Sequence, residues 1–453
     1  MNAKETDEDG TGTPFKNFIS FAMPRTASSV VLTVVDFAIL FIYFEGYNLN
    51  PILVGISLMC GKFAIAISQF TMGYLSDTIR SEKYGKRKPF MIIGAPILSI
   101  SFILILLPTV FLGPNPNQLS LFLWLLIFDI LFQFFYGELT TPYQSWMAEQ
   151  FEIHERPSAA AWQNIFNYIG TGIAVLFIYL AIPTVMEDFH KTKVINPLFT
   201  FIIFIFAILT ISLFYSSAFL LPVESDPPIK LNLKEDLSKI VQDRNYLHVC
   251  MMVGIASLTW SMITGIMLGY IENVLKLTNA IYGAGGLAVG VVFSLFAWKK
   301  IIDKKGKKTA LMIIFIWAII SIPFAGIIPL LPFDDFTIPA LVLVIIVSAS
   351  LGGWFLFPYI LYADLAENNK KSGEQEELKA GLYTGFPSIL LNIFQAFGLL
   401  ITGLILVLPD VPGETYSWGY LIWAPVGSAI LIVAVLYLRR FITLDFEWEE
   451  KLE

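Results

Sequence analysis

The stretch that decides the fold is Asp77-Thr-Ile-Arg-Ser-Glu-Lys-Tyr-Gly85-Lys86-Arg87-Lys88, a charged segment between two long apolar runs. A shorter version, Asp303-Lys-Lys-Gly306-Lys307-Lys308, lies at the same place in the second half of the chain, and its glycine follows Gly85 by 221 residues. Basic loops are topology signals, but that role does not require an Asp and a Gly at matched offsets. The recurrence therefore indicates a duplicated unit of about half the chain.

The composition of the 453-residue chain predicts a membrane protein. Apolar residues make up 56%, charged residues only 14%, and the mean hydropathy is +0.70. Soluble proteins carry about 25% charged residues, and one helical span needs about 20 apolar residues. We expect an all-α polytopic protein with twelve transmembrane helices in two six-helix bundles. The expected spans lie near 28–46, 51–75, 90–113, 119–147, 158–186, 196–222, 247–274, 278–298, 309–332, 337–363, 381–408 and 417–438.

The spans divide the chain into five regions. We expect a tail over 1–27, a bundle over 28–222, a polar linker over 223–246, a second bundle over 247–438 and a tail over 439–453. Of the 29 Lys and Arg residues, 25 fall in the two tails and in the loops after the even-numbered spans. Lys and Arg mark cytoplasmic loops, so we expect a cell-membrane protein with both termini and the linker in the cytoplasm.

A second motif pair supports the duplication. Span 4 ends in Pro142-Tyr143-Gln-Ser-Trp-Met-Ala148-Glu149, and span 10 ends in Pro358-Tyr359-Ile-Leu-Tyr-Ala363-Asp364. The prolines are 216 residues apart, which is close to the offset of the first pair. Duplicated bundles are typical of secondary transporters, which bind their substrate between the halves near the middle of the membrane.

Other function classes gain no support. The net charge is -7, and the basic residues are confined to short loops, which argues against a nucleic-acid partner. Cys60 and Cys250 lie inside apolar segments and provide neither a disulfide framework nor a metal site. The three histidines are not at ligand spacing, and no nucleophile and base stand together. We therefore expect no enzymatic activity, no metal and no cofactor.

The motifs of this chain resemble those of a known transporter family. The run Gly73-Tyr-Leu-Ser-Asp77 and its continuation to Gly94 look like the signature after helix 2 in the glycoside-pentoside-hexuronide:cation symporters. These are the melibiose-permease-like branch of the major facilitator superfamily. The two Pro-Tyr segments and the stretch from Gly381 to Gly398 are similar to the same family, so the resemblance covers almost the whole chain. It implies the major facilitator fold, alternating access and, commonly, a sugar carried with a cation.

The loop motif makes physical sense as a gate. The Asp77 carboxylate can pair with Arg87 and accept hydrogen bonds from a facing helix N-terminus, which would close the cytoplasmic side in one state only. The alternative is a merely solvated run of charges. The residues of this expected gate motif are Asp77, Gly85, Arg87, Asp303 and Gly306.

The sequence departs from the family at the coupling site. Counting back from Gly73, the basic position of the family's helix 2 falls on Lys62, but its two acids fall at Ile65 and Gln69. A sodium site of carboxylate oxygens cannot be built from those side chains. The family's other charged positions, on helices 5, 11, 4 and 1, fall at or near Gln163, Asn392, Thr140 and Ser29. Sodium coupling and galactoside contacts of the usual kind are therefore in doubt.

Four other ionisable residues lie within the spans: Asp36, Lys62, Asp129 and Glu138. An ionised group at mid-bilayer costs at least ~2.5 kcal/mol, so these side chains should face the protein interior. Three acids against one lysine favour protonation of at least one acid, which is proton-coupling chemistry. The alternative is that Asp36 or Asp129 pairs with Lys62 as a fixed clasp between helices.

Amide and aromatic side chains in the spans suit an uncharged polyol, which needs hydrogen bonds to its hydroxyls and an apolar face for its ring. The candidates for substrate binding are Gln144, Trp162, Gln163, Asn164, Asn167, Trp260, Asn392 and Gln395. Amides in membrane helices also bond neighbouring helices, so each could be structural instead.

These observations favour a secondary active transporter that moves a small polar solute, a sugar or glycoside, by alternating access together with a proton. The lipid bilayer is its other partner. Two alternatives stay open: a carrier of lysophospholipids or similar amphiphiles with the same fold, and a non-transporting membrane receptor or scaffold. The substrate, the coupling ion and the oligomeric state are not given by the sequence.

Overall fold

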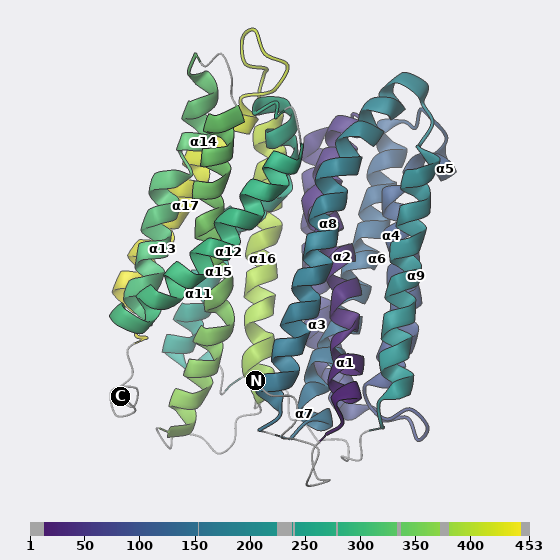
Figure 1. Ribbon diagram of the computed structural model, residues 1–453, viewed down its shortest axis with the longest axis vertical. Helices are drawn as coiled ribbons and strands as arrows, with labels where there is room; N and C mark the ends of the chain where they lie inside the picture. The colour runs from purple at the N-terminus through teal and green to yellow at the C-terminus, as the bar shows by residue number, and fades with distance from the viewer. Residues whose placement is uncertain are drawn as a thin grey trace.

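The computed structural model of the chain describes residues 13–152, 154–223, 238, 241–277, 280–332, 337–371 and 380–444. Twelve helical stretches in this part of the chain are long and apolar enough to cross a membrane, which confirms the predicted fold class. The two halves of the chain form two bundles that stand side by side (Figure 1). We call the end at which α1 begins and α17 ends the lower end, at the bottom of Figure 1, and the opposite end the upper end.

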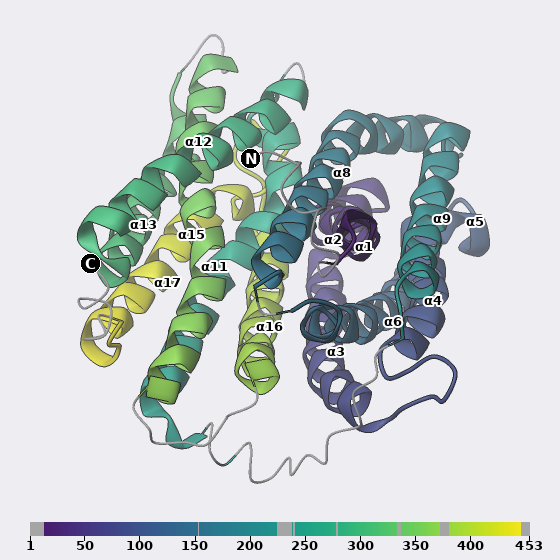
Figure 2. The same ribbon diagram turned by 60° about the horizontal axis from the view of Figure 1, so that its bottom comes forward.

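The helices of the N-terminal half are α1 Phe15–Ala22, α2 Pro24–Phe41, η1 Ile42–Gly46, α3 Pro51–Thr78, α4 Lys88–Leu106, α5 Pro108–Leu112, α6 Gln118–Ser145, α7 Met147–Gln150, α8 Arg156–Thr192 and α9 Pro197–Leu220. Those of the C-terminal half are α11 Arg244–Gly269, η2 Tyr270–Val274, α12 Ala280–Lys305, α13 Lys307–Ser321, α14 Phe324–Ile327, η3 Ile328–Leu330, α15 Thr337–Lys371, α16 Ala380–Leu406 and α17 Gly419–Phe441. Figure 2 shows the two groups apart, with α3 and α16 adjoining between them.

The first helical stretch begins earlier than the sequence predicts. The expected span starts at residue 28, whereas α1 already begins at Phe15 and α2 follows it directly, with Pro24 at its first position. Aromatic contacts hold α1 in place: the rings of Phe18 and Phe151 stack at 4.7 Å, and Phe21 packs on Phe151 as well. The predicted tail over 1–27 therefore includes a helix packed on the N-terminal bundle. Most of the predicted linker over 223–246 lies outside the described residues.

Short polar signals set several helix starts at the upper end. The side chain of Asn50 accepts a hydrogen bond from the backbone N–H of Ile52, and Asn196 does the same for Leu198. In both helices a proline follows the asparagine at the first helical position, where its missing N–H costs nothing. The Asn-Pro pairs thus explain why α3 and α9 start where they do.

The two halves repeat each other in space as well as in sequence. The ammonium of Lys88 donates to the carbonyl of Leu221 at the end of α9, and that of Lys308 donates to the carbonyl of Ile442 at the end of α17. Both lysines follow a glycine with positive φ, 75° at Gly85 and 76° at Gly306. A positive φ favours glycine, so both copies of the Gly-basic motif need a glycine at this position.

The upper ends of α2 and α11 repeat each other too. Each continues into a single π-helical turn, η1 and η2. The hydroxyl of Tyr43 donates to the carbonyl of Ile105, and the hydroxyl of Tyr270 donates to that of Ala325. π-turns inside α-helices often occur at functional positions. Here they place Glu45 and Glu272, each two residues after its tyrosine, at the upper end.

Near the upper end the bundles touch backbone to backbone. A Cβ at Gly55 of α3 would lie 3.0 Å from the carbonyl oxygen of Leu399 and 3.2 Å from the Cα of Gly403 on α16. Small residues allow such close approach between membrane helices. Leu40 and Leu399 lie over Gly265 of α11 just below this crossing. The pathway between the bundles is therefore closed toward the upper end.

Candidate functional site

An ion pair joins two helices in the middle of the N-terminal bundle. The ammonium of Lys62 on α3 lies 2.9 Å from the Asp36 carboxylate on α2. The Lys62 side chain is 8% exposed, and that of Asp36 is 24% exposed. Asp36 is thus the member of the pair that a solute could reach. It lies one turn below Leu40 of the upper closure.

Asp129 of α6 completes this cluster. Its side chain is fully buried, and neither carboxylate oxygen accepts a hydrogen bond of good geometry. The carboxylate lies against the backbone of Gly61, where an added Cβ would overlap it, and Lys62 and Asp36 are close enough to act on its charge. Because Gly61 has no side chain, the Asp129 carboxylate can lie against α3 directly beside Lys62.

Glu138 lies apart from the other three. It follows Asp129 by nine residues on α6, about 13.5 Å along the helix, and its carboxylate faces Gly94 of α4. Its residue exposure is 5%, and its Oε2 atom has no hydrogen-bond partner. The structure thus brings Asp36, Lys62 and Asp129 together and leaves Glu138 between α4 and α6.

One of the predicted amides bridges the two bundles. The Asn392 side chain of α16 donates to Gln69 of α3 at 3.1 Å and to the carbonyl of Ser388 at 2.8 Å. Gln69 occupies a position where the resemblance expected an acid, and the sequence reasoning did not count it as a site residue. Its only signal was a polar side chain inside an apolar span.

The predicted residues of α8 and α6 line the lower half of the N-terminal bundle. Asn167 accepts a hydrogen bond from the hydroxyl of Ser29 on α2, and Gln163 is half-buried with its Nε2 atom unpaired. Asn164 and Gln144 are exposed. The Trp162 ring meets Phe15 of α1 edge-on at 5.4 Å. This region combines one unpaired amide group, at Gln163, with exposed amides and an aromatic ring.

The predicted substrate-binding residues Trp260 and Gln395 of the C-terminal half lie on different helices, α11 and α16. Trp260 is 3% exposed, its indole N–H has no partner, and its ring lies 5.9 Å from that of Trp354. It therefore lies in the packed interior of that bundle. Gln395 is half-buried on α16, one turn above Asn392.

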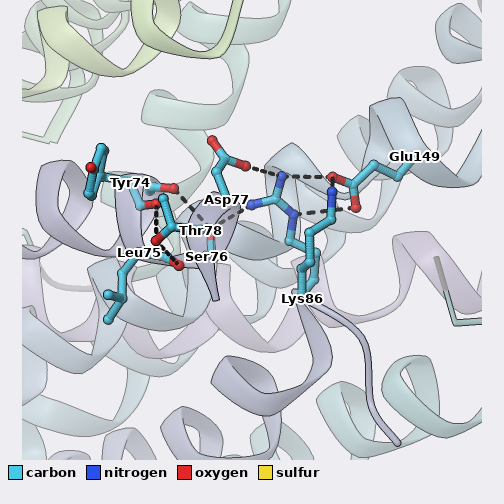
Figure 3. Close-up of polar contacts among 9 residues, drawn as sticks. Tyr74, Leu75, Ser76, Asp77, Thr78, Lys86 and Glu149 are labelled. Atoms are coloured by element: carbon cyan, nitrogen blue, oxygen red, sulfur yellow. Dashed lines mark hydrogen bonds and ion pairs between the residues drawn. The ribbon is translucent and has the colours of Figure 1, made fainter. Parts of the chain in front are cut away.

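The charged loop motif forms a compact ionic cluster at the lower end of the N-terminal bundle. The Arg87 guanidinium pairs with Asp77 and, at 2.8 Å, with Glu149, and it also donates to the hydroxyl of Ser76. Lys86 lies 3.1 Å from the same Glu149 carboxylate. Figure 3 shows Lys86 and Glu149 beside Asp77 and Ser76. The predicted Asp77 to Arg87 pair is thus present as part of a larger network.

The carboxylates of this network favour the charged form of Arg87. Burial alone would lower the pKa of Arg87, but the paired carboxylates of Glu149 and Asp77 hold it above its usual value. Sequence reasoning placed Glu149 only in the Pro-Tyr repeat, and the signal that could have found it was the Ala-acid ending that both repeats share.

The equivalent loop of the C-terminal half is more open. Asp303 is exposed at the lower end of α12, and Gly306 precedes α13. The side chain of Asp364, the counterpart of Glu149, lies outside the described residues. Within the described chain no three His, Cys, Asp or Glu residues are placed to hold a metal ion.

Comparison with known proteins agrees with this architecture. The fold is similar to a D-xylose-proton symporter (15% identity, TM-score 0.62, 94% of this chain and 96% of that chain). It is also similar to the nucleoside transporter NupG (14%, 0.62, 94% and 99%). A third similar structure is a bacterial homolog of the human lysosomal transporter Spinster in an inward-facing, unoccupied conformation (14%, 0.61, 94% and 97%).

A search of curated proteins finds no match to the chain. The family model described as MFS/sugar transport protein matches residues 20–442, almost the whole chain. The resemblance drawn from the loop motifs is thereby confirmed, and so is the expectation of a transporter rather than an enzyme. The chain therefore belongs to the MFS/sugar transport protein family of major facilitator transporters.

Proposed function

We propose that this protein carries a sugar or glycoside across the cell membrane by alternating access, and that proton movement drives it. The observation that carries the proposal is the cluster of Asp36, Lys62 and Asp129. Lys62 balances one carboxylate, and its partner is Asp36 at 2.9 Å. The other acid is left without a compensating charge of its own.

The burial of Asp129 favours a proton as the coupling ion. A buried carboxylate without hydrogen bonds is costly when ionised and becomes neutral by binding a proton. Sodium prefers several oxygen ligands, whereas the helix 2 positions that would supply carboxylates hold Ile65 and Gln69. Asp129 is accordingly the proton carrier in this proposal, and Lys62 is the ion-pair partner of Asp36.

The candidate binding residues support an uncharged, hydroxyl-rich substrate. Gln163, Asn164 and Asn167 follow one stretch of α8, and Trp162 offers an aromatic face beside them. Lys62 and Asp36 are engaged with each other and Asp129 is fully buried, which leaves amides as the recognition groups. The family description and the similar fold of a D-xylose-proton symporter support the same substrate class.

The lower end faces the cytoplasm in this proposal. The basic residues of the described chain gather there, whereas the upper end holds Lys191, Lys193 and Lys276. The cluster of Asp77, Arg87 and Glu149 then acts as a cytoplasmic gate element, because its charges hold the loop after α3 against α7.

Transport by purified protein in liposomes tests the coupling. A pH-sensitive dye inside the liposomes should report acidification when a transported sugar is added from a panel of pentoses, hexoses and disaccharides. An inward proton gradient should drive accumulation, and a sodium gradient should not. Asp129→Asn should abolish accumulation but spare exchange of labelled sugar, because exchange needs no net proton movement.

Asp188→Asn is the matched control, because it makes the same change at an exposed position of α8. This control should accumulate sugar normally. Sodium-driven accumulation, or undiminished accumulation by Asp129→Asn, would contradict the proton proposal. Transport of lysophosphatidylcholine in place of every sugar would establish the amphiphile carrier instead.

A further inference from the structure

A hydrogen bond links the two bundles at the upper end. The hydroxyl of Tyr420, in the first turn of α17, donates to the Glu45 carboxylate in η1 at 2.6 Å. Tyr420 is 1% exposed, and Glu45 is half-buried. A charge-assisted hydrogen bond shielded from water is among the stronger polar contacts in proteins. This bond lies above the leucines that close the pathway.

The surrounding backbone is shaped to allow this bond. The Tyr420 hydroxyl passes directly over Gly269 of α11, where an added Cβ would overlap the hydroxyl oxygen. The His190 ring of α8 is hydrogen-bonded at 2.9 Å to the backbone carbonyl of Glu45. Elements of both bundles thus position the two partners: α8 contacts the backbone of Glu45, and Gly269 of α11 leaves room for the Tyr420 hydroxyl.

Two other buried tyrosines, unlike Tyr420, donate their hydroxyl hydrogen bonds within a single bundle. Tyr43 donates to Ile105 within the N-terminal bundle, and Tyr270 donates to Ala325 within the C-terminal bundle. These bonds survive any movement of one bundle against the other. The bond from Tyr420 joins the bundles and must break whenever their upper ends separate.

We propose that Glu45 and Tyr420 are positioning residues of the transport cycle, forming the latch that holds the upper end of the pathway shut. The π-turn η1 displaces Glu45 from the regular helical register and aims it across the interface. Opening of the upper end breaks this bond, and closing restores it. The proposal rests on the transporter fold and is independent of the substrate and of the coupling ion.

Spin-label distances across the upper end test the latch. Labels are placed by Val194→Cys and Thr415→Cys, two exposed upper-end positions in opposite halves, after Cys60→Ala and Cys250→Ala. Tyr420→Phe and Glu45→Ala should each move the population from the short toward the long distance, by about tenfold in the ratio, which is ~1.4 kcal/mol. The double variant should shift no further than either single variant, because both remove the same bond.

Tyr270→Phe is the matched control: it deletes a buried hydroxyl bond of the same kind inside one bundle, so it should leave the distance ratio unchanged. If Tyr420→Phe fails to fold, Gly269→Ala displaces the hydroxyl and should give the same shift. An unchanged ratio in folded Tyr420→Phe, or an equal shift in Tyr270→Phe, would overturn the proposal. Sugar uptake is not needed for the readout, so failure of the transport proposal would be seen separately.

Discussion

The carboxylate of Asp129 lies against α3 at Gly61, a place that a larger residue could not share. Helix propensity alone would favour alanine there, since glycine in a helix costs roughly 0.5–1 kcal/mol. The space that Gly61 leaves for the Asp129 carboxylate explains why glycine stands there. A single missing methyl group allows a buried acid to lie beside the ion pair of Asp36 and Lys62.

Gly61→Ala should therefore impair the protein in two ways. The new methyl group would overlap the Asp129 carboxylate and meet the Gln133 side chain at 3.1 Å, which is overpacking that costs roughly 1–3 kcal/mol. We expect a lower melting temperature and loss of proton-driven accumulation, measured by thermal unfolding in detergent and by liposome uptake. Gly172→Ala is the control because a Cβ there meets nothing, and it should leave both quantities intact. Unchanged melting and uptake in Gly61→Ala would show that the contact is not needed.

The sequence predicts some of these contacts and not others, for physical reasons. Asp36 and Lys62 were expected to face inward because a lone charge in lipid is too costly, and pairing is the simplest relief. No such rule pairs Asn392 with Gln69, since amides tolerate many partners and these two are 323 positions apart. The ion pairs of Glu149 with Arg87 and Lys86 were not predicted, because an acid at a helix end is ordinary until its basic neighbours are located in space.

Helix α1 shows how a charged end can hold an element in place. The backbone N–H and the hydroxyl of Thr13, just before α1, both donate to the Glu155 carboxylate at 2.8 Å. Burial would raise the pKa of Glu155, but these hydrogen bonds lower it below the usual value. Because the folded state prefers the ionised acid, the docking of α1 is fully stabilised above the unfolded pKa of about 4.3 and is lost as the pH falls through the lower, folded pKa.

Hydrogen exchange over 15–22 should therefore accelerate on acidification. The protection of the amides in α1 should be constant near neutral pH and fall below about pH 4.3, after correction for intrinsic exchange. Glu155→Gln should exchange faster at neutral pH and lose the acid dependence, since the amide cannot ionise. The exposed pair Glu187 and Lys191 offers a control, and Glu187→Gln should not change the protection of α1. A pH-independent protection in the unmodified protein would refute the role of Glu155.

The start of α1 is also the largest error of the span prediction. Pro24 and Arg25 interrupt the apolar pattern, so a span bounded by charges and prolines is expected to begin only near residue 28. The structure extends the helix because Phe15, Phe18 and Phe21 find aromatic partners from distant parts of the chain. Such contacts are tertiary and leave no local signature. Positions of the other spans follow from their apolar runs, which the bilayer thickness constrains.

The molecule as a whole is asymmetric in charge along its long axis. Basic residues gather at the lower end, in the loops that follow α3 and α12 and near the end of α17. These residues resist translocation, which predicts a cytoplasmic lower end.

Cysteine labelling in intact cells checks this orientation. In a background with Cys60→Ala and Cys250→Ala, Val194→Cys at the upper end should react with an impermeant maleimide. Lys304→Cys at the lower end of α12 should react only after the cells are permeabilised. Reaction of Lys304→Cys in intact cells would reverse the assigned orientation.

The two bundles repeat their scaffolding but not their charges. Ser68 meets Gly137 in one half, and Ser294 meets Gly352 in the other, so the same helix crossing is built twice. With the spacing that relates Tyr43 to Tyr270, Asp36 corresponds to Ile263. With the spacing that relates Ser68 to Ser294, Lys62 corresponds to Ala288. The ion pair is therefore no requirement of the fold.

The one-sided placement of the cluster has an electrical consequence. With Asp129 protonated, the three groups Asp36, Lys62 and Asp129 carry no net charge, and with it ionised they carry a single negative charge. A membrane voltage then does no work on the loaded carrier but acts on the empty one, by up to about 2.3 kcal/mol per 100 mV. An interior-negative voltage pushes that negative charge outward. In the proposed cycle, voltage would therefore speed the return of the empty carrier rather than the delivery of its cargo.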